Sequence, residues 1–411
     1  MLDVDFVRSR FPALDGEWIF FDNAGGSQIL TPVLERMRDY LVGCNVQHGA
    51  SYAVSHEAGA RLRAATAAMA TYVNAADPSE IVMGPSSTQL LRILAGSLVQ
   101  TLQPGDEIIV TNCDHEANIG PWVELERSGV RVKVWRLDPD SYQLRLEDLE
   151  QLLTARTRLV AVTHVSNVLG SIHPIAEIAR AVHERGAMIC VDGVAYAPHR
   201  PVDVRELDAD FYVFSFYKVY GPHHALLYGK REHLLRLPGM NHYFIAPTDV
   251  PYKFQPGSVN YELSYAMLGL WDYLDELAAR HSAAGLADDP RERLRFLFER
   301  IARHEERLAA RLLAFLAEKP SVRVIGTATS DRNQRVPTIS FVVDGRASDT
   351  ITTAVDRHKI GIRYGHFYAK RLIDDLGLQA QNGVVRVSMV HYNTLDEVER
   401  LIEALDPLLK A

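Results

Sequence analysis

The stretch Asp210-Phe-Tyr-Val-Phe-Ser-Phe-Tyr-Lys218-Val-Tyr-Gly-Pro222 decides the fold predicted for this chain. In it, a run of apolar residues leads almost directly to a lysine. Earlier in the chain, the apolar residues Ile189-Cys-Val are followed at once by Asp192. Short apolar runs of this kind are typical of buried strands. The sequence therefore predicts an acid and a lysine at the ends of two strands.

This pair of side chains suits pyridoxal phosphate (PLP) as a cofactor. A lysine amine forms a Schiff base with the aldehyde of PLP. A carboxylate that pairs with the pyridine nitrogen keeps this nitrogen protonated, so that the ring can accept electrons. Lys218 and Asp192 are therefore predicted to be the catalytic lysine and its partner acid.

Length and composition limit the class of protein. At 411 residues the chain is too long for one compact core, which predicts two domains. A hydrophobic content of 47% is ordinary for a globular protein, and a formal net charge of -8 offers no basic surface for nucleic acid. Three scattered cysteines indicate neither a disulfide framework nor a zinc site, and no histidine pair has the spacing of metal ligands.

The N-terminal residues and the apolar runs bear on where the protein works. Four of the first ten residues are charged, where a signal peptide would need an apolar segment. No apolar run approaches the roughly 20 residues that span a bilayer. We therefore expect a cytoplasmic enzyme that binds neither a membrane nor nucleic acid.

Residues 80–230 alternate short apolar runs with amphipathic stretches. This alternation is typical of an α/β fold with a mostly parallel sheet, covered by helices on both faces, whose ligands bind at the carboxyl ends of the strands. The expected strands are 107–111, 130–135, 159–163 and 188–192, and the expected helices are 119–128, 145–153 and 175–184.

The rest of the chain predicts a second, smaller α+β domain. A loop is expected over the proline-containing residues 229–260, followed by a helix over 261–280 and a linker over 282–290. The further expected elements are a long helix from Pro290 to Leu316 and strands at 322–325, 338–343 and 384–389. The predicted organisation is an N-terminal segment at 1–15, a large cofactor-binding domain at 16–260 and a small C-terminal domain at 261–411.

Three further segments offer candidate cofactor contacts. Pro85-Ser-Ser-Thr88 precedes an amphipathic helix, and hydroxyls and free amides at a helix start bind anions such as the cofactor phosphate. A plain helix cap is the alternative interpretation. His115 has an imidazole that can stack on the pyridine ring, and Asn167 can donate to the phenolate oxygen. A solvated loop histidine and a turn asparagine are the alternatives for these two residues.

Together these motifs resemble the class V aminotransferase family and, within it, the cysteine desulfurases. The resemblance spans nearly the whole chain. Its segments are Phe21-Asp-Asn-Ala-Gly25, Asp114 to Trp122, Ser166-Asn-Val-Leu-Gly170, Val191 to His199 and Asp210 to Pro222. It implies PLP-dependent transferase fold type I, with a mostly parallel, seven-stranded type of sheet in the large domain and a smaller α+β C-terminal domain.

The resemblance also implies roles in binding the cofactor. Lys218 would form the Schiff base, Asp192 would pair with the pyridine nitrogen, and His115 would stack on the ring. Other side chains would hold the phosphate or the phenolate oxygen, or would contact the cofactor beside Lys218; they are Ser87, Thr88, Asn167, Ser215 and Tyr217. Ser258 would reach the phosphate of the partner subunit, which implies a homodimer with a shared active site.

The resemblance assigns the substrate side of the site as well. Arg386 would grip the carboxylate of a small amino-acid substrate, because its guanidinium binds a carboxylate through two hydrogen bonds. A surface charge at a strand end is the alternative for Arg386. Arg363, Asn167 and His48 are further candidates for substrate contacts, and a solvated loop histidine is the alternative for His48.

One position departs from a desulfurase. In one group of desulfurases, a mobile cysteine that takes up sulfur follows Arg-x-Gly-His-His, whereas this chain reads Arg363-Tyr-Gly-His-Phe-Tyr368. A phenol cannot carry a persulfide, and its pKa of about 10 leaves little phenolate at neutral pH. Cys44 and Cys113 remain open as replacement thiols, whereas Cys190 is expected in the core.

Two positions close to the predicted cofactor depart from the desulfurase pattern too. Tyr217 stands where desulfurases usually have histidine, and Ala195 stands where they usually have glutamine. The alanine removes one hydrogen bond to the cofactor oxygen, and Tyr196 or Tyr217 is a candidate to replace it.

The sequence therefore predicts a PLP-dependent enzyme that cleaves the C–S bond of a cysteine-like amino acid, either as a desulfurase-like protein or as a β-lyase. Freed Lys218 would remove the α-proton, and Tyr368 or His366 would protonate the leaving group. A PLP-dependent aminotransferase or epimerase is the alternative. A non-catalytic PLP-binding protein is a more distant one.

Overall fold

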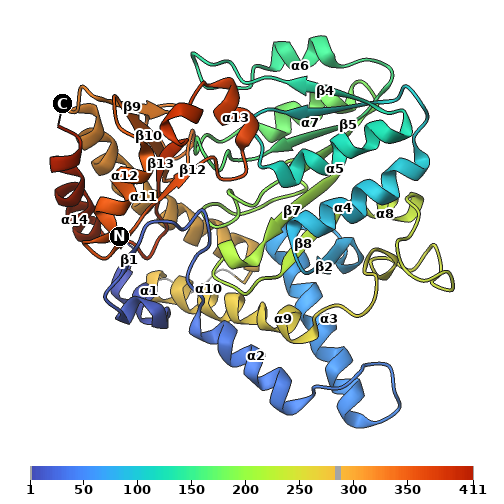
Figure 1. The fold of residues 1–411 in the computed structure, drawn as a ribbon. Helices are drawn as coiled ribbons and strands as arrows, with labels where there is room; N and C mark the ends of the chain where they lie inside the picture. The colour runs from blue at the N-terminus through green and yellow to red at the C-terminus, as the bar shows by residue number, and fades with distance from the viewer. Residues whose placement is uncertain (1, 283–287, 411) are drawn as a thin grey trace.

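The computed structural model describes residues 2–282 and 288–410. A seven-stranded sheet with its helices forms one part of the molecule, and a four-stranded sheet with its helices lies beside it (Figure 1). Most of the linker expected over 282–290 lies outside the described residues. The predicted domain boundaries remain a prediction.

The large sheet has the strand order β2-β8-β7-β6-β5-β3-β4. Its strands are β2 (Ile81–Gly84), β3 (Glu107–Thr111), β4 (Arg131–Trp135), β5 (Thr157–Thr163), β6 (Met188–Asp192), β7 (Phe211–Ser215) and β8 (Ala225–Gly229). Pairing is parallel from β7 to β4, whereas β8 runs antiparallel to both of its neighbours. The prediction of a mostly parallel, seven-stranded sheet is confirmed.

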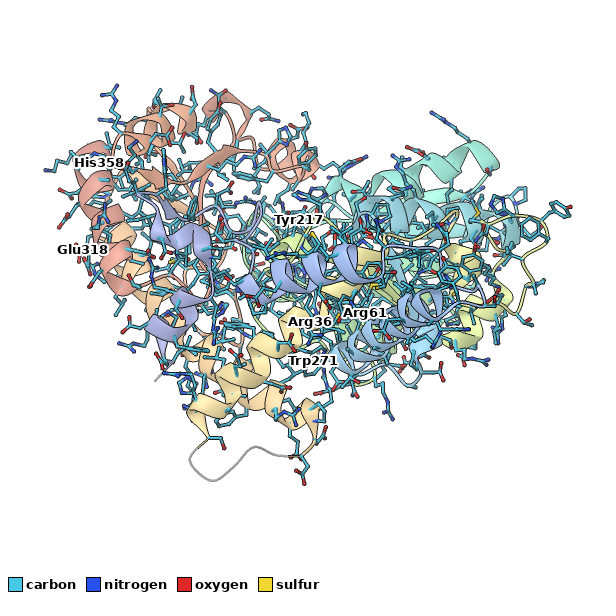
Figure 2. The ribbon with its side chains drawn as sticks, turned by 90° about the horizontal axis from the view of Figure 1, so that it is seen from below. Arg36, Arg61, Tyr217, Trp271, Glu318 and His358 are labelled. Carbon is cyan, nitrogen blue, oxygen red and sulfur yellow. The ribbon has the colours of Figure 1, made fainter. Side chains whose placement is uncertain are left out.

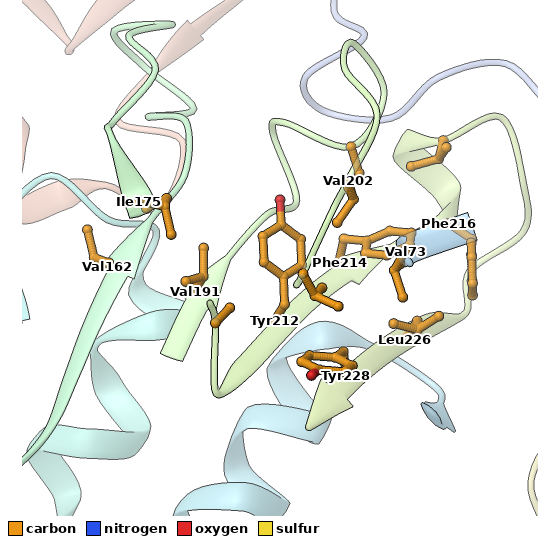
Figure 3. Close-up of a cluster of buried hydrophobic side chains, with 14 of the residues drawn as sticks. Val73, Val162, Ile175, Val191, Val202, Tyr212, Phe214, Phe216, Leu226 and Tyr228 are labelled. Carbon is orange, nitrogen blue, oxygen red and sulfur yellow. The ribbon is translucent and has the colours of Figure 1, made fainter. Parts of the chain in front are cut away.

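Helices cover both faces of this sheet because alternate strand residues point to opposite sides. On β3, Ile108 and Val110 pack under α4 (Ser87–Leu98) and α5 (Gly120–Val123). Ile109 belongs to the core on the other face, with α3 (Ala53–Val73), α6 (Leu146–Leu152), α7 (Ile175–His183) and α10 (Leu268–His281). Figure 3 shows part of this second core, where Val162, Val191 and Tyr212 project from neighbouring strands.

The four-stranded sheet of the smaller part is antiparallel, with the order β12-β13-β10-β9. Its strands are β9 (Val322–Ile325), β10 (Thr338–Val343), β12 (Arg363–Gly365) and β13 (Val384–Ser388). A separate apolar core joins this sheet to α11 (Pro290–Ala317), α12 (Ser348–Asp356) and α14 (Leu395–Leu405). The smaller α+β part is thus confirmed.

The N-terminal region connects the two parts. After α1 (Val4–Ser9), β1 (Ile19–Phe20) pairs with β11 (Ile360–Gly361) of the smaller part. The chain then passes the turn that follows β7, where Ser27 Oγ donates to the Tyr217 carbonyl over 3.2 Å, and enters α2 (Thr31–Gly43). Figure 2 shows Arg36 of α2 and Arg61 of α3 on the underside, where Arg36 pairs with Asp272 of α10.

Three expected elements differ from the structure. Residues 229–260, expected to be a loop, contain α8 (Arg231–Arg236). The helix expected over 261–280 is divided at Met267 into α9 (Tyr261–Ala266) and α10, and the one expected over 119–128 is the short α5 followed by a 3-10 turn. Among the described residues, no helix is both long enough and apolar enough to cross a membrane.

Candidate active site

Lys218 and Asp192 come together because their strands are parallel neighbours. Asp192 is the last residue of β6, and Lys218 closes the 3-10 turn that follows β7. The carboxyl ends of parallel strands meet at the same edge of a sheet, where ligands bind. Both side chains line one cavity at this edge.

The same cavity gathers most of the side chains expected at the cofactor. They are Ser87, Thr88, His115, Asn167, Asp192, Ser215, Tyr217 and Lys218. Ala195 also lines the cavity, at the position where desulfurases usually have glutamine. Ser258 is the one expected cofactor contact that lies elsewhere in this chain.

The charges of Lys218 and Asp192 are tuned by burial and by their neighbours. Burial and the nearby Arg386 lower the pKa of Lys218 to about 8, while Asp192 opposes this shift. Burial raises the pKa of Asp192, although the Val194 N–H donates to its Oδ1 over 2.9 Å. A cationic partner would stabilise the charged form of this buried carboxylate, and a protonated pyridine nitrogen is such a partner. This property fits the proposed cofactor.

Hydroxyl groups at the start of α4 form a cradle for an anion. Ser86 is the helix cap, since its Oγ accepts the Gln89 N–H. Ser87 and Thr88 are therefore free of the capping role, and they line the cavity together with Ser86. Ser87 Oγ lies 2.7 Å from Ser215 Oγ, so hydroxyls from two chain segments meet at the positive end of a helix. This arrangement agrees better with a phosphate-binding site than with a plain helix cap.

His115 forms a wall of the cavity beside Tyr368. Burial and the positive charges of Lys218 and Arg386 lower the pKa of His115 to about 4, so its ring is neutral at neutral pH. Its Nδ1 accepts the Ala117 N–H over 3.1 Å, which fixes the ring. The Tyr368 ring stacks against it, with ring centres 5.1 Å apart and an angle of 29° between the planes. A neutral, fixed imidazole is suited to stacking on a second aromatic ring.

Asn167 is only partly satisfied by the protein. Its Nδ2 donates to the Phe367 carbonyl over 2.8 Å. Its buried Oδ1 has no hydrogen-bond partner among the described residues. A buried polar atom without a partner is unusual, and at a cavity wall it marks a place for a ligand. The orientation found here directs the amide donor to the protein, whereas the sequence predicted donation to the cofactor.

Arg386 is fully buried beside the cavity, at the junction of the two parts of the molecule. Its Nη2 donates to Asp22 Oδ1 over 2.8 Å and its Nη1 to the Asn167 carbonyl over 3.1 Å. The guanidinium carbon lies 3.8 Å from the centre of the Phe367 ring. Its buried Nε has no partner among the described residues, so Arg386 retains donor capacity for a ligand. The alternative of a surface charge does not fit this burial.

The segment that follows β12 covers this corner of the site. Phe367 and Tyr368 both have left-handed backbone conformations, with φ of 50° and 60°. The carbonyl of Tyr368 accepts the Glu116 N–H over 2.8 Å, and Asn167 holds the carbonyl of Phe367. These contacts fix an unusual backbone beside the cavity, and both residues line a separate pocket. The Tyr368 side chain is 64% exposed and therefore reachable from solvent.

The two remaining substrate candidates flank the site at different distances. Arg363 is half-exposed, and its Nη1 lies 3.7 Å from Asp22 Oδ2, next to Arg386. His48 lines a different groove, in which its ring packs against Tyr261. Ser258 lines this second groove as well. Within one chain, His48 and Ser258 are thus separate from the Lys218 cavity.

None of the three cysteines is placed as a reactive thiol. All are buried, with Cys44 1% exposed and Cys113 and Cys190 0% exposed. Burial raises the pKa of each thiol. Thiolates are the nucleophilic form, and this environment suppresses them.

Two contacts were missed by the sequence analysis. Asp22 lies within Phe21-Asp-Asn-Ala-Gly25, a motif that was noted without a role for its acid, yet it is the ion-pair partner of Arg386. Gly25 makes room for it, since a Cβ there would lie 2.7 Å from Asp22 Oδ2. Phe367 was passed over because an apolar residue in a loop carries no chemical signal of its own.

Comparisons with known proteins agree with this geometry. The chain matches the family model described as Aminotransferase class-V over residues 19–287 and 291–401. It is 45% identical to the aminotransferase-like protein FGM3 of Gibberella zeae, over 99% of this chain and 98% of that protein. It is 38% identical to the cysteine desulfurase-like protein ustD of Aspergillus flavus, over 100% of this chain and 91% of that protein.

A solved structure is similar throughout. The apo structure of a cysteine desulfurase from Thermococcus onnurineus NA1 superposes with a TM-score of 0.88 and 27% identity, covering 100% of this chain and 98% of that one. Members of this family use PLP, and the cavity around Lys218 has the side chains to hold it. The chain therefore belongs to the class-V aminotransferase family and is a PLP-dependent enzyme.

Proposed function

We propose that this enzyme cleaves the C–S bond of a cysteine-like amino acid as a β-lyase, without holding sulfur on the protein. One observation carries the proposal. Tyr368, at the sequence position where one group of desulfurases has its sulfur-accepting cysteine, stacks on His115 of the cavity wall, and all three cysteines are buried with raised pKa values. The sulfur product must then leave directly.

The residues divide the work between holding the substrate and moving protons. PLP, when bound, supplies an electron sink for the bond that breaks at the α-carbon. Lys218 has a lowered pKa of about 8, so its amine can accept the α-proton near neutral pH. Asp192, at the end of β6, would hold the pyridine nitrogen, and Ser87, Thr88 and Ser215 would hold the phosphate.

Arg386 and Asn167 form the carboxylate-binding corner. The free Nε of Arg386 and its outer Nη protons are the donors available to a substrate carboxylate. Asp22 keeps the guanidinium in place, and Arg363 adds a second positive charge nearby. This corner would orient the α-carbon toward Lys218.

Tyr368 and His366 are the candidates to protonate the departing sulfur. The His366 Nδ1 accepts the Tyr368 N–H over 3.1 Å, which orients the two side chains relative to one another. The phenol ring of Tyr368 is exposed to solvent and stacks on His115. A phenol that keeps its proton at neutral pH is a donor rather than a nucleophile.

The products decide between this proposal and its alternatives. We would incubate the PLP-loaded enzyme with L-cysteine, L-cystine and L-cysteine S-oxides and measure pyruvate, ammonia and alanine. β-Elimination followed by hydrolysis gives one pyruvate and one ammonia per sulfur compound released. Alanine would show desulfuration and overturn the proposal. Exchange of the α-proton alone would indicate an epimerase, and a keto acid with aminated cofactor an aminotransferase. A protein that turns over no amino acid would be a non-catalytic PLP binder.

We further propose that two copies form a shared active site. Ser258 lies in the second groove, away from its own Lys218 cavity, so it can serve only the cavity of a partner. Mixing Lys218→Ala chains with Ser258→Ala chains tests this arrangement at limiting PLP. Mixed dimers contain one site with both residues, so activity should rise above that of either variant alone. Activity that equals the average of the two would refute the shared site.

A further inference from the structure

A buried histidine connects the turn that carries Lys218 to the chain that leaves the Arg386 strand. His391 follows β13 and is 0% exposed. Its Nδ1 lies 3.0 Å from the hydroxyl of Tyr220, in the Lys218 turn, and its Nε2 lies 2.6 Å from the hydroxyl of Tyr273 on α10. None of these three residues lines the Lys218 cavity.

The hydrogen bonds of this cluster have a fixed direction. The Tyr220 hydroxyl donates its only proton to the Pro198 carbonyl over 2.9 Å. Toward His391, the Tyr220 oxygen must then accept, so the Nδ1 of His391 carries the proton. The Nε2 of a neutral imidazole is consequently an acceptor, and the Tyr273 hydroxyl donates to it. Burial lowers the pKa of His391 to about 3, in keeping with a neutral ring.

Tyr220 needs such support because of its backbone. Its φ is 63°, which lies in the left-handed region that residues other than glycine rarely adopt. Its N–H donates to Ser27 Oγ over 2.9 Å, and its carbonyl accepts the Leu30 N–H over 3.0 Å. The side-chain contacts with His391 and Pro198 fix the remaining end. A strained turn persists only where its surroundings hold it, and Tyr220 lies two residues after Lys218 in the same turn.

The packing around the cluster leaves no room for adjustment. The ring of Phe11 meets Tyr220, Tyr273 and His391 edge-on, with centre distances of 5.6, 5.9 and 5.9 Å. All four rings are at most 2% exposed. Interiors packed in this way transmit a displacement rather than absorb it. A change at His391 therefore reaches the Lys218 turn.

We propose that His391 is a positioning residue that holds the Lys218 turn in register with the Arg386 strand, through the proton that its Nδ1 donates to Tyr220. The fold thereby sets the separation between the lysine and the carboxylate-binding arginine. The inference depends on the PLP site alone and is independent of which bond the enzyme cleaves.

Two amide substitutions test the direction of the hydrogen bond. The side-chain nitrogen of His391→Asn can occupy the place of Nδ1 and donate to Tyr220. In His391→Gln the amide reaches the place of Nε2, so the donor to Tyr220 is lost. We expect amide hydrogen exchange at residues 219–221 of the PLP-free protein to rise about tenfold in His391→Gln and to stay near wild type in His391→Asn.

The loaded enzyme supplies a second readout. In His391→Gln, the pH midpoint of the cofactor absorbance should shift and kcat/KM should fall about ten- to a hundredfold, because a displaced lysine is poorly aligned. His391→Asn should restore both. The same exchange rates and the same pH midpoint in the two variants would overturn the proposal, even if both lower the melting temperature.

Two tyrosine variants guard against a general loss of packing. Tyr220→Phe removes the acceptor of the hydrogen bond and should reproduce the exchange pattern of His391→Gln. Tyr40→Phe is the matched control, since the Tyr40 hydroxyl is fully buried and has no partner among the described residues. If Tyr220→Phe leaves exchange at 219–221 as unchanged as Tyr40→Phe does, His391 has no positioning role.

Discussion

The half of the site that faces the cofactor and the half that faces the substrate are built differently. The cofactor half consists of strand ends and a helix start of the large sheet, around Asp192, Ser215 and Lys218. The substrate half joins three distant segments, which contribute Asp22, Arg386 and the residues after β12. Sheet topology fixes the first half, whereas the second depends on loops and on the junction of the two parts. The cofactor half thus identifies the family, and the substrate half decides the reaction.

Removing the central lysine should have the largest effect. Lys218→Ala should abolish the imine absorbance and reduce turnover to background, because both the covalent link and the base are lost. Borohydride reduction of the PLP-loaded protein followed by peptide mapping should label Lys218 alone. Lys253 is the internal control, since it is also buried but donates to three backbone carbonyls. Label on Lys253 would contradict the assignment of the site.

The substrate half can be broken at its arginine. Arg386→Gln should raise KM for an amino acid about a hundredfold, since it removes a charge-assisted, two-point contact. For the corresponding amino-acid amide, KM should rise far less, because this substrate lacks the carboxylate. Arg363→Gln should have a smaller effect, as its side chain is 56% exposed. Equal losses for acid and amide would show that Arg386 does not bind the carboxylate.

The proposed acid of the substrate half should act selectively. Tyr368→Phe should slow elimination of a poorly departing thiolate about ten- to a hundredfold and leave a good leaving group unaffected. The measurement compares cysteine S-conjugates whose thiols differ in pKa. If the elimination rate depends on the pKa of the departing thiol with the same slope in both enzymes, Tyr368 takes no part in proton transfer and His366 remains the candidate.

The phosphate cradle of the cofactor half offers a milder disturbance. Ser87→Ala or Ser215→Ala should weaken PLP binding about tenfold, because each removes one hydrogen bond to a charged group. Ser86→Ala is the matched control. It removes the cap of α4, so it should lower stability by about 1 kcal/mol, and since Ser86 also lines the cavity, PLP affinity should fall less than in Ser87→Ala. Cofactor titration and thermal unfolding separate the two outcomes.

The smallest expected effect is a shift in pH dependence. Only the neutral amine of Lys218 attacks the PLP aldehyde, so imine formation in the PLP-free protein should accelerate as pH rises and level off above about 8. Arg386→Gln should raise this midpoint, since Arg386 lowers the pKa of Lys218. Asp192→Asn should lower it, since Asp192 raises that pKa. A midpoint near the ordinary lysine value of about 10.4 would contradict the burial argument.

Much of the cofactor half could be predicted because each of its residues sits beside an apolar run. Strand patterns place Asp192 and Lys218 at one sheet edge, and the pattern around Ser87 indicates a helix start. Asp22 also follows an apolar run, Ile19-Phe-Phe21, but its role was not predicted because its partner is 364 residues away in the chain. Likewise, one expected helix is divided at Met267 into two pieces that both pack against α2 and α3, and periodicity does not reveal such a division.

By itself, the sequence pointed to an α/β fold with a mostly parallel sheet and to PLP as the cofactor, because strand patterns and single side chains indicate these features, and its resemblance to the family added the seven strands and the missing sulfur acceptor. Only the tertiary structure decided that the cysteines are buried, that Arg386 is paired with Asp22 beneath Phe367, and that Ser258 lies outside its own cavity. Burial and ion pairing are properties of segments brought together from far apart. They arise when the two sheets pack together, so the order of residues along the chain does not predict them.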